Sequence, residues 1–131
     1  MFKFKCNNTE WTIEEVDEAT INNEEKNDYT LGLTFYKTNK IWLLNNNVNK
    51  IRTLKHELMH VWLWEYGHSQ DEDRKYSYEE VCEIVASSNS FVNEVVEQYI
   101  KGPKTITTSI YIDGNKIGQT ISNKLSMMGQ S

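Results

Sequence analysis

Two histidines and a glutamate lie close together near the middle of the chain, in the pattern HExxH at residues 56–60. On a helix, residues four apart lie one above the other, so His56 and His60 would present both imidazoles on one face and could bind one metal ion. Glu57 lies beside them and would be free to take a proton from a water that the metal activates. The motif therefore predicts a zinc site with His56 and His60 as ligands and Glu57 as the catalytic general base.

The residues around the motif predict the helix that it needs. Apolar side chains recur with helical spacing over residues 54–64, Asn46 or Asn47 is available as an N-cap, and Gly67 is suited to end the helix. The alternative is a core helix whose two histidines make only hydrogen bonds. We favour the metal site because a glutamate between two histidines on an otherwise apolar helix has no packing purpose.

A catalytic zinc ion usually has three protein ligands and one open position, so a third ligand is expected downstream. The metzincin pattern would place Gly at position 63 and His at position 66, where this chain has Leu63 and Tyr66, and that family is excluded. His68 follows Gly67, beyond the expected end of the helix, where its side chain would point away from the metal. We therefore interpret His68 as a surface residue and expect the ligand on the next helix.

A second helix is expected to begin at residue 78, after a polar loop at residues 68–77. At about 100° per residue, the stripe that this helix would bury consists of Tyr78, Cys82, Val85, Asn89, Val92, Val96 and Tyr99. Glu79 lies nearest the stripe, Glu83 lies one turn further along the same edge, and Glu80 points outward as part of a solvated acidic first turn. We predict Glu79 as the third ligand and Glu83 as the carboxylate that orients a ligand histidine, or the two roles exchanged.

At these residues the chain resembles the ImmA/IrrE-type small metallopeptidases of bacteria and phages. The resemblance covers roughly residues 30–95 and rests on HExxH followed about twenty residues later by Glu79-x-x-Cys82-x-x-Val85-Ala86, where the family has E-x-x-A-x-x-F-A. It implies a minimal, gluzincin-like zincin fold, one zinc ion per chain held by two His and one Glu, and an intracellular peptidase that often targets a repressor or another DNA-bound protein. Cys82 and Val85 depart from the family's Ala and Phe.

The composition fits one domain of ordinary size. The chain has 131 residues, of which 38% are hydrophobic, and four Trp, which is enough to bury a core. A formal charge of −5 and only two arginines, Arg52 and Arg74, argue against nucleic-acid binding, so the expected partner is a protein or peptide substrate. Cys6 and Cys82 are interpreted as reduced thiols, and HExxH sites rarely add a thiolate ligand such as Cys82.

The N-terminal half of the chain predicts a sheet. Residues 2–5 and 11–16 are typical of short strands, residues 22–28 of a polar loop, and residues 31–44 of a hairpin that turns at 37–40. We predict an α+β fold in which a small antiparallel sheet leads into the HExxH helix, and this helix packs against the second one. The hairpin would supply a sheet edge able to bind an extended peptide, although a purely structural hairpin would have the same sequence.

The chain changes character after residue 102. We predict a zincin-like metallopeptidase domain over residues 1–101 and an extension over residues 102–131, with a strand at 105–112 followed by a turn and a short helix at 116–125. The Ile-Tyr-Ile-Asp-Gly-x-Lys-Ile-Gly pattern in this extension is similar to the ends of phage structural proteins, which implies a phage or prophage origin.

No run is long enough to span a membrane, and residues 1–5 lack the apolar stretch of a signal peptide, so we expect a cytoplasmic protein of a bacterium or a phage-infected cell. We predict a zinc-dependent metalloendopeptidase that hydrolyses a peptide bond in a specific protein partner. The alternative is a non-catalytic protein-binding module on a zincin scaffold, and the intact Glu57 argues against it. Tyr66, Tyr76 and Tyr78 are candidate oxyanion donors, and their spacing selects none of them.

Overall fold

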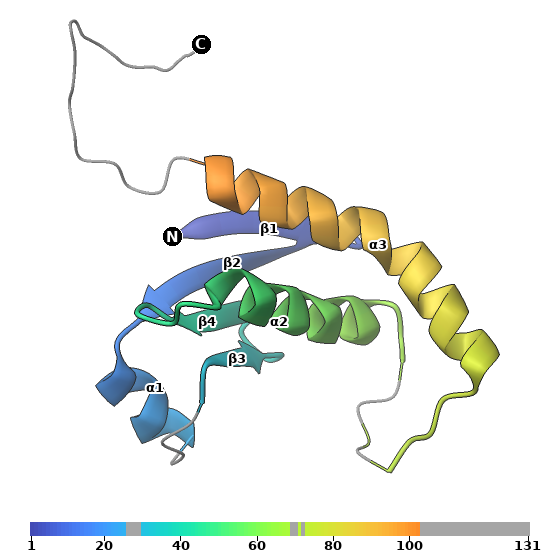
Figure 1. Ribbon diagram of the computed structural model, residues 1–131, viewed down its shortest axis with the longest axis horizontal. Coiled ribbons are helices and arrows are strands. Elements are labelled where there is room, and N and C mark those ends of the chain that lie inside the picture. The colour runs from blue at the N-terminus through green and yellow to red at the C-terminus, as the bar shows by residue number, and fades with distance from the viewer. Residues whose placement is uncertain (26–29, 69–70, 72, 103–131) are drawn as a thin grey trace, which may run out of the picture.

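The computed structural model describes residues 1–25, 30–68, 71 and 73–102, and the predicted strand, turn and helix at 105–125 lie outside these residues. The elements in chain order are β1 Phe2–Cys6, β2 Thr9–Val16, α1 Glu18–Glu25, β3 Gly32–Phe35, β4 Lys40–Leu44, α2 Lys50–Glu65 and α3 Tyr78–Lys101 (Figure 1). The predicted α+β class is confirmed. No helix in the described part of the chain is both long and apolar enough to cross a bilayer.

The four strands form one sheet in the order β1-β2-β4-β3. The β3–β4 pair is antiparallel, as the predicted hairpin requires, and β1–β2 is antiparallel as well, but β2 and β4 at the centre are parallel. The sheet is therefore mixed, and the prediction of an antiparallel sheet is wrong at this pair. A parallel pair needs a crossover connection between its two strands. Here the connection from β2 to β4 contains α1 and β3, and α1 occupies part of the predicted polar loop.

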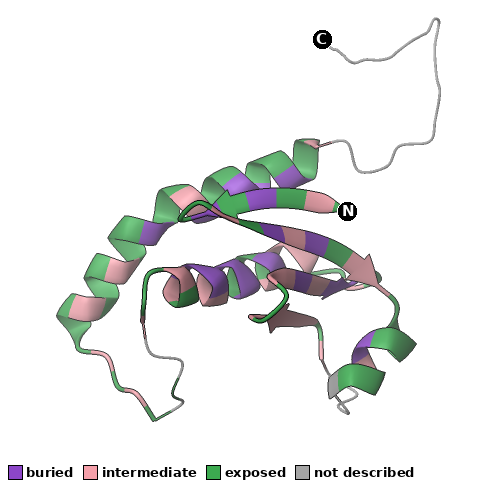
Figure 2. Cartoon of the chain, turned by 180° about the vertical axis from the view of Figure 1, so that it is seen from behind, coloured by how far each residue is buried: buried purple, intermediate pink, exposed green. Residues whose placement is uncertain are grey.

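One face of the sheet and the two long helices enclose the core. Alternate strand residues point to this face and are almost fully buried, among them Phe4, Trp11, Ile13, Ile41 and Leu43, while intervening residues such as Lys3, Lys5 and Glu14 are exposed (Figure 2). Leu54, Leu58 and Val61 from α2 and Val92, Val95 and Val96 from α3 pack against them. The period of two in the strands and of 3.6 in the helices thus matches the sequence pattern.

Helix α2 carries the HExxH motif and is longer than predicted at its start. It begins at Lys50 with Asn49 at the N-cap, so the prediction of Asn46 or Asn47 at this position is wrong by two or three residues. The predicted stop at Gly67 is confirmed: Gly67 has a φ of 81°, and the N–H groups of Gly67 and His68 donate to Trp64 and Leu63. This is a Schellman motif, which needs a residue that tolerates the left-handed conformation.

Helix α3 begins at Tyr78, as predicted, because Ser77 and Glu80 form a capping box. Its predicted buried stripe is right only in the second half: Val92, Val96 and Tyr99 are buried, with Ser88 and Val95 beside them, whereas Tyr78, Cys82, Val85 and Asn89 are exposed (Figure 2). The helix has 24 residues and is about 36 Å long, while its partner strand β1 has 5 residues and spans about 17 Å. The first turns of α3 therefore extend beyond the sheet (Figure 1).

The two cysteines should differ sharply in reactivity. Cys6 is buried, and burial, followed by the charge of Glu65, raises the pKa of its thiol to about 12, whereas Cys82 is exposed on α3. A raised pKa keeps the nucleophilic thiolate scarce at neutral pH. We expect a thiol reagent to modify one cysteine per native chain, and peptide mapping to identify it as Cys82. Rapid native labelling of Cys6 would contradict the packing described here, and labelling in denaturant is the control for the total of two thiols.

Candidate metal and peptide site

His56 and Glu57 of the HExxH motif lie on the side of α2 that faces strand β3, and His60 lies one turn after His56. His56 is exposed, His60 is partly buried, and the centroids of their rings are 4.9 Å apart. Two imidazoles this close on successive turns of a helix can bind one metal ion, since zinc–nitrogen bonds are about 2.0–2.1 Å long. The structure therefore brings together the first two predicted ligands.

Glu57 is the one charged residue in the described part of the chain that belongs to the buried class, at 7% exposure, and it lies between α2 and β3. The hydroxyl group of Thr34 donates a hydrogen bond of 2.6 Å to Glu57 Oε1. Thr34 pairs with the buried Ile41 in the β3–β4 register, and residues in register point to the same face of a sheet. The alternation of β3 thus directs Thr34 toward α2 and holds the carboxylate of Glu57 in place.

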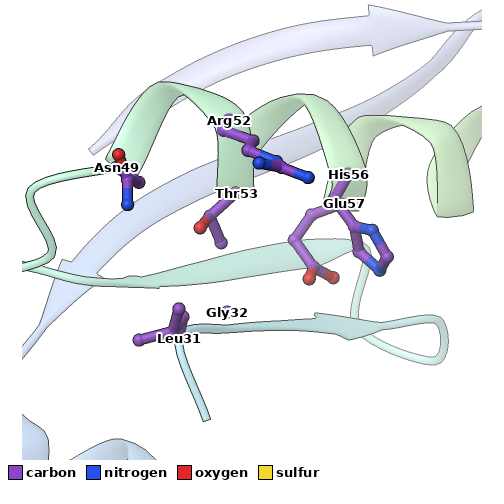
Figure 3. A pocket seen from close by; sticks show the side chains of 7 residues that line it. All are labelled: Leu31, Gly32, Asn49, Arg52, Thr53, His56 and Glu57. Atoms are coloured by element: carbon purple, nitrogen blue, oxygen red, sulfur yellow. The ribbon is translucent and has the colours of Figure 1, made fainter. Parts of the chain in front are cut away.

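Gly32 allows β3 to approach α2 this closely. A Cβ atom at this position would lie 2.8 Å from Thr53 Cγ2 and 3.2 Å from Glu57 Cγ and Oε2. The space above β3 is a cavity of about 430 Å³, lined by Leu31, Gly32, Asn49, Arg52, Thr53, His56 and Glu57 (Figure 3). A cavity of this size can accept a peptide side chain beside His56 and Glu57. We call it the Arg52 pocket.

The two glutamates predicted to complete the site lie elsewhere. Glu79 and Glu83 line a second cavity, of about 510 Å³, together with His68 and Cys82. Neither glutamate lines the Arg52 pocket, because both belong to the part of α3 that extends beyond the sheet. Within the described residues, no three His, Cys, Asp or Glu side chains are gathered closely enough to hold a metal ion.

Of the predicted ligands, the imidazoles of His56 and His60 are therefore adjacent, and neither predicted glutamate joins them in a three-residue group. The carboxylate of Glu80 is engaged in structural hydrogen bonds. It accepts hydrogen bonds from the Ser77 N–H and from Arg74, at 2.8 and 2.7 Å, and these bonds hold the pKa of its carboxyl group below the ordinary value. Glu80 thus lies in the acidic first turn, as predicted, but its carboxylate is bonded rather than solvated, and Glu80 is less exposed than Glu79 or Glu83.

The remaining predicted residues are distributed around the end of α2. His68 is partly buried rather than a plain surface residue, because its ring stacks on Trp62 with centroids 5.4 Å apart. Tyr66 is half exposed and also contacts Trp62, Tyr76 packs beneath the guanidinium of Arg74, and Tyr78 is 93% exposed. None of the three predicted oxyanion donors lines the Arg52 pocket.

Three residues near the site were not predicted from the sequence: Thr34, Tyr36 and Arg52. Tyr36 stacks on Trp64 with ring centroids 4.6 Å apart, and burial, followed by the charge of Glu57, raises the pKa of its hydroxyl group. The alternation of residues 31–36 could have indicated Thr34, since it shares a face with Gly32 and Tyr36. Arg52 could have been found from its position one turn before His56.

Among the strands that the structure describes, β3 lies at the edge of the sheet, with β4 as its neighbour. The predicted hairpin edge is thus confirmed as a sheet edge, and it runs along the side of α2 that carries His56 and Glu57 (Figure 3). An edge strand has unpaired N–H and C=O groups that can bind an extended chain.

No protein-family model, no curated protein and no solved structure matches this chain. The likeness to the ImmA/IrrE-type metallopeptidases therefore rests on the motif residues alone.

The fit of Gly32 against α2 can be tested with a double-mutant cycle. Gly32→Ala should lower the free energy of unfolding by about 1–3 kcal/mol, because its Cβ would overlap Thr53 Cγ2. Thr53→Ser removes that methyl group and keeps the hydroxyl group that accepts a hydrogen bond from Asn47, so the double variant should recover much of the loss. Urea unfolding of the four proteins measures this. If Gly32→Ala costs the same in the Thr53→Ser variant as in the unmodified chain, the close approach is not as described.

Proposed function

We propose that this protein is a zinc-dependent metalloendopeptidase that hydrolyses a peptide bond in a protein partner. The observation that carries the proposal is the placement of Glu57: a buried carboxylate, oriented by Thr34, lies beside two adjacent imidazoles and faces an edge strand. Burying a carboxylate is costly, and replacing it by an apolar residue would suit the neighbouring Leu54 and Leu58 better. A catalytic role for Glu57 explains why a charge is present there.

Each residue of the site would have a separate role in the reaction. His56 and His60 would hold the ion, with Glu79 or Glu83 as the third ligand. Bound zinc supplies Lewis acidity, which lowers the pKa of water and polarises a carbonyl group. Glu57 would take the proton of the attacking water and pass it to the leaving amine. The Thr34 hydroxyl group limits the rotation of Glu57, so its free oxygen can face the cleft.

The substrate would bind as an extended chain along β3. Main-chain hydrogen bonds to the strand edge would fix the direction of the peptide, and the neighbouring cavity would select a side chain. The likeness to the ImmA/IrrE-type enzymes makes a repressor or another DNA-bound protein the first candidate substrate, and the cytoplasm of a bacterium or a phage-infected cell the first candidate location.

Completion of the metal site requires the first turns of α3 to move relative to α2. Glu79 and Glu83 lie before Ser88, the first fully buried residue of the helix, in a segment whose side chains are mostly exposed. Ile84 is the side chain of this segment that packs against the core, so its contacts would have to change in such a movement. Closure would bring a carboxylate to the two imidazoles only when an ion is present to hold it, which is a physical basis for a latent enzyme.

The alternative proposal is a non-catalytic binding module. The observation that favours it is the apolar surface on the first turns of α3, where Tyr78, Val81 and Val85 are 93%, 47% and 56% exposed. A partner protein that covered these side chains could leave the glutamates away from the histidines permanently. The two proposals differ in whether the chain cleaves a peptide bond in a reaction that needs Glu57.

Metal content tests the ligand assignment. Protein purified without chelator and supplied with zinc should contain about one ion per chain by elemental analysis. His60→Ala should lose it, and Glu79→Gln or Glu83→Gln should reduce it, whereas Glu80→Gln is the matched control because glutamine can still form the capping box. Full occupancy in His60→Ala would refute the site, and equal occupancy in all three glutamine variants would move the third ligand elsewhere.

Glu57→Gln tests the proposed general base. This substitution keeps the size of the side chain and its bond to Thr34, so zinc content should be unchanged while cleavage falls by about 10²–10⁴-fold. Cleavage is measured by mass spectrometry on randomised peptide libraries and on host or phage proteins, with the exposed Glu94→Gln as the charge-matched control. Undiminished cleavage by Glu57→Gln would exclude Glu57 as the base.

A further inference from the structure

Arg52 lines the pocket that holds His56 and Glu57, one helical turn before His56 on α2 (Figure 3). The opposite wall consists of Leu31 and Gly32 at the beginning of β3. The guanidinium group is thus placed where a substrate lying along β3 would pass before it reaches the histidines.

The side chain of Arg52 is exposed and makes no ion pair or hydrogen bond with any part of the chain that the structure describes. Several other described cations are engaged: Arg74 with Glu80, Lys50 with Glu15 and Lys101 with Glu97. The chain has 19 acidic and 14 basic residues, so it contains more carboxylates than cations that could pair with them. Its guanidinium group is left available.

The stability of α2 does not explain the arginine either. Arg52 lies in the first turn of the helix, which contains no acidic residue. The N-terminus of a helix carries a partial positive charge, so a cation there is unfavourable and an anion is favourable. Arg52 and the beginning of α2 therefore both attract a negatively charged ligand toward the same end of the cleft.

We propose that Arg52 is a specificity-determining residue that binds a carboxylate of the peptide substrate, so that substrates carry an acidic side chain near the scissile bond. The inference rests on the proposed peptidase function and names its substrate class. A guanidinium group matches a carboxylate with two parallel hydrogen bonds, and the nearby Asn49 amide can add a donor.

The geometry also indicates the end of the cleft at which the acidic residue of the substrate would bind. Strand β3 and helix α2 run in the same direction: Gly32 contacts Thr53 near the beginning of the helix, and Tyr36 stacks on Trp64 near its end. A substrate along β3 would thus place its acidic residue at the Gly32 end and meet the aromatic pair at the other end, with His56 and His60 between them.

Binding selection tests this inference without relying on turnover. The full chain carrying Glu57→Gln, supplied with zinc, is used to capture peptides from two synthetic libraries, and the retained peptides are sequenced by mass spectrometry. The first library has randomised positions and blocked ends, so Asp and Glu are its carboxylates. The second lacks Asp and Glu and has a free C-terminal carboxylate. The capture from each library is repeated with the variants Arg52→Gln, Arg52→Lys and Lys55→Gln. Lys55→Gln is the control, because it removes the same charge from an exposed position outside the pocket.

We expect peptides from the first library to be enriched in Asp or Glu at one position. Arg52→Gln should abolish the enrichment and weaken binding of a selected peptide by about tenfold or more, Arg52→Lys should keep part of it, and Lys55→Gln should keep it fully. Selective capture from the second library would support the Arg52–carboxylate contact and identify the chain end as its source.

Peptides retained without acidic preference, or equal losses in Arg52→Gln and Lys55→Gln, would overturn the assignment of Arg52. The peptidase proposal would survive that result, because it depends on zinc content and on cleavage that requires Glu57. Capture of no peptide from either library would overturn the Arg52 assignment as well.

Discussion

The hydrogen bond between Thr34 and Glu57 depends on the close approach of strand β3 to helix α2, and this approach organises the whole site. Gly32 and Thr34 share the helix-facing side of β3: one leaves room for Thr53 and Glu57, and the other supplies the donor. A larger residue at position 32 would separate the strand from the helix, and an apolar residue at 34 would leave Glu57 Oε1 without this donor. The site therefore requires a small residue and a hydroxyl group two positions apart.

A second set of contacts holds the beginning of α2. Glu15 on β2 accepts hydrogen bonds from Lys50, at 2.8 Å, and from the hydroxyl group of Tyr99. Burial, followed by the bond to Glu15, raises the pKa of Tyr99, so the hydroxyl group stays protonated and remains a donor. These contacts join β2, the first turn of α2 and the end of α3. The same turn carries Arg52, so its pocket is built on a well-anchored part of the fold.

The two halves of helix α3 differ in how closely they pack against the rest of the molecule. Its last turns pack on β1 through Tyr99 against Phe2 and Phe91 against Phe4, with ring centroids 5.4 and 6.0 Å apart. Its first turns extend past the sheet and present Glu79 and Glu83 to a separate cavity. A zinc site that joins these glutamates to α2 would couple metal binding to the position of the least packed segment of the helix, in the way that metal binding is coupled to folding elsewhere.

Local sequence was enough to specify the elements and the chemistry of single helix faces. Hydrophobic periodicity and the turn residues predicted β3, β4, α2 and the beginning of α3, and Gly67 predicted the end of α2. HExxH placed two imidazoles on one helix face with a carboxylate beside them. All of these features depend on neighbours within a few residues. The parallel β2–β4 pair, the contact of Thr34 with Glu57 and the exposure of Glu79 became known only from the packed chain. A helical projection treats a helix as covered along its whole length. Whether a given turn is covered depends on how far the neighbouring elements extend, and both neighbours of α3, helix α2 and strand β1, are shorter than α3.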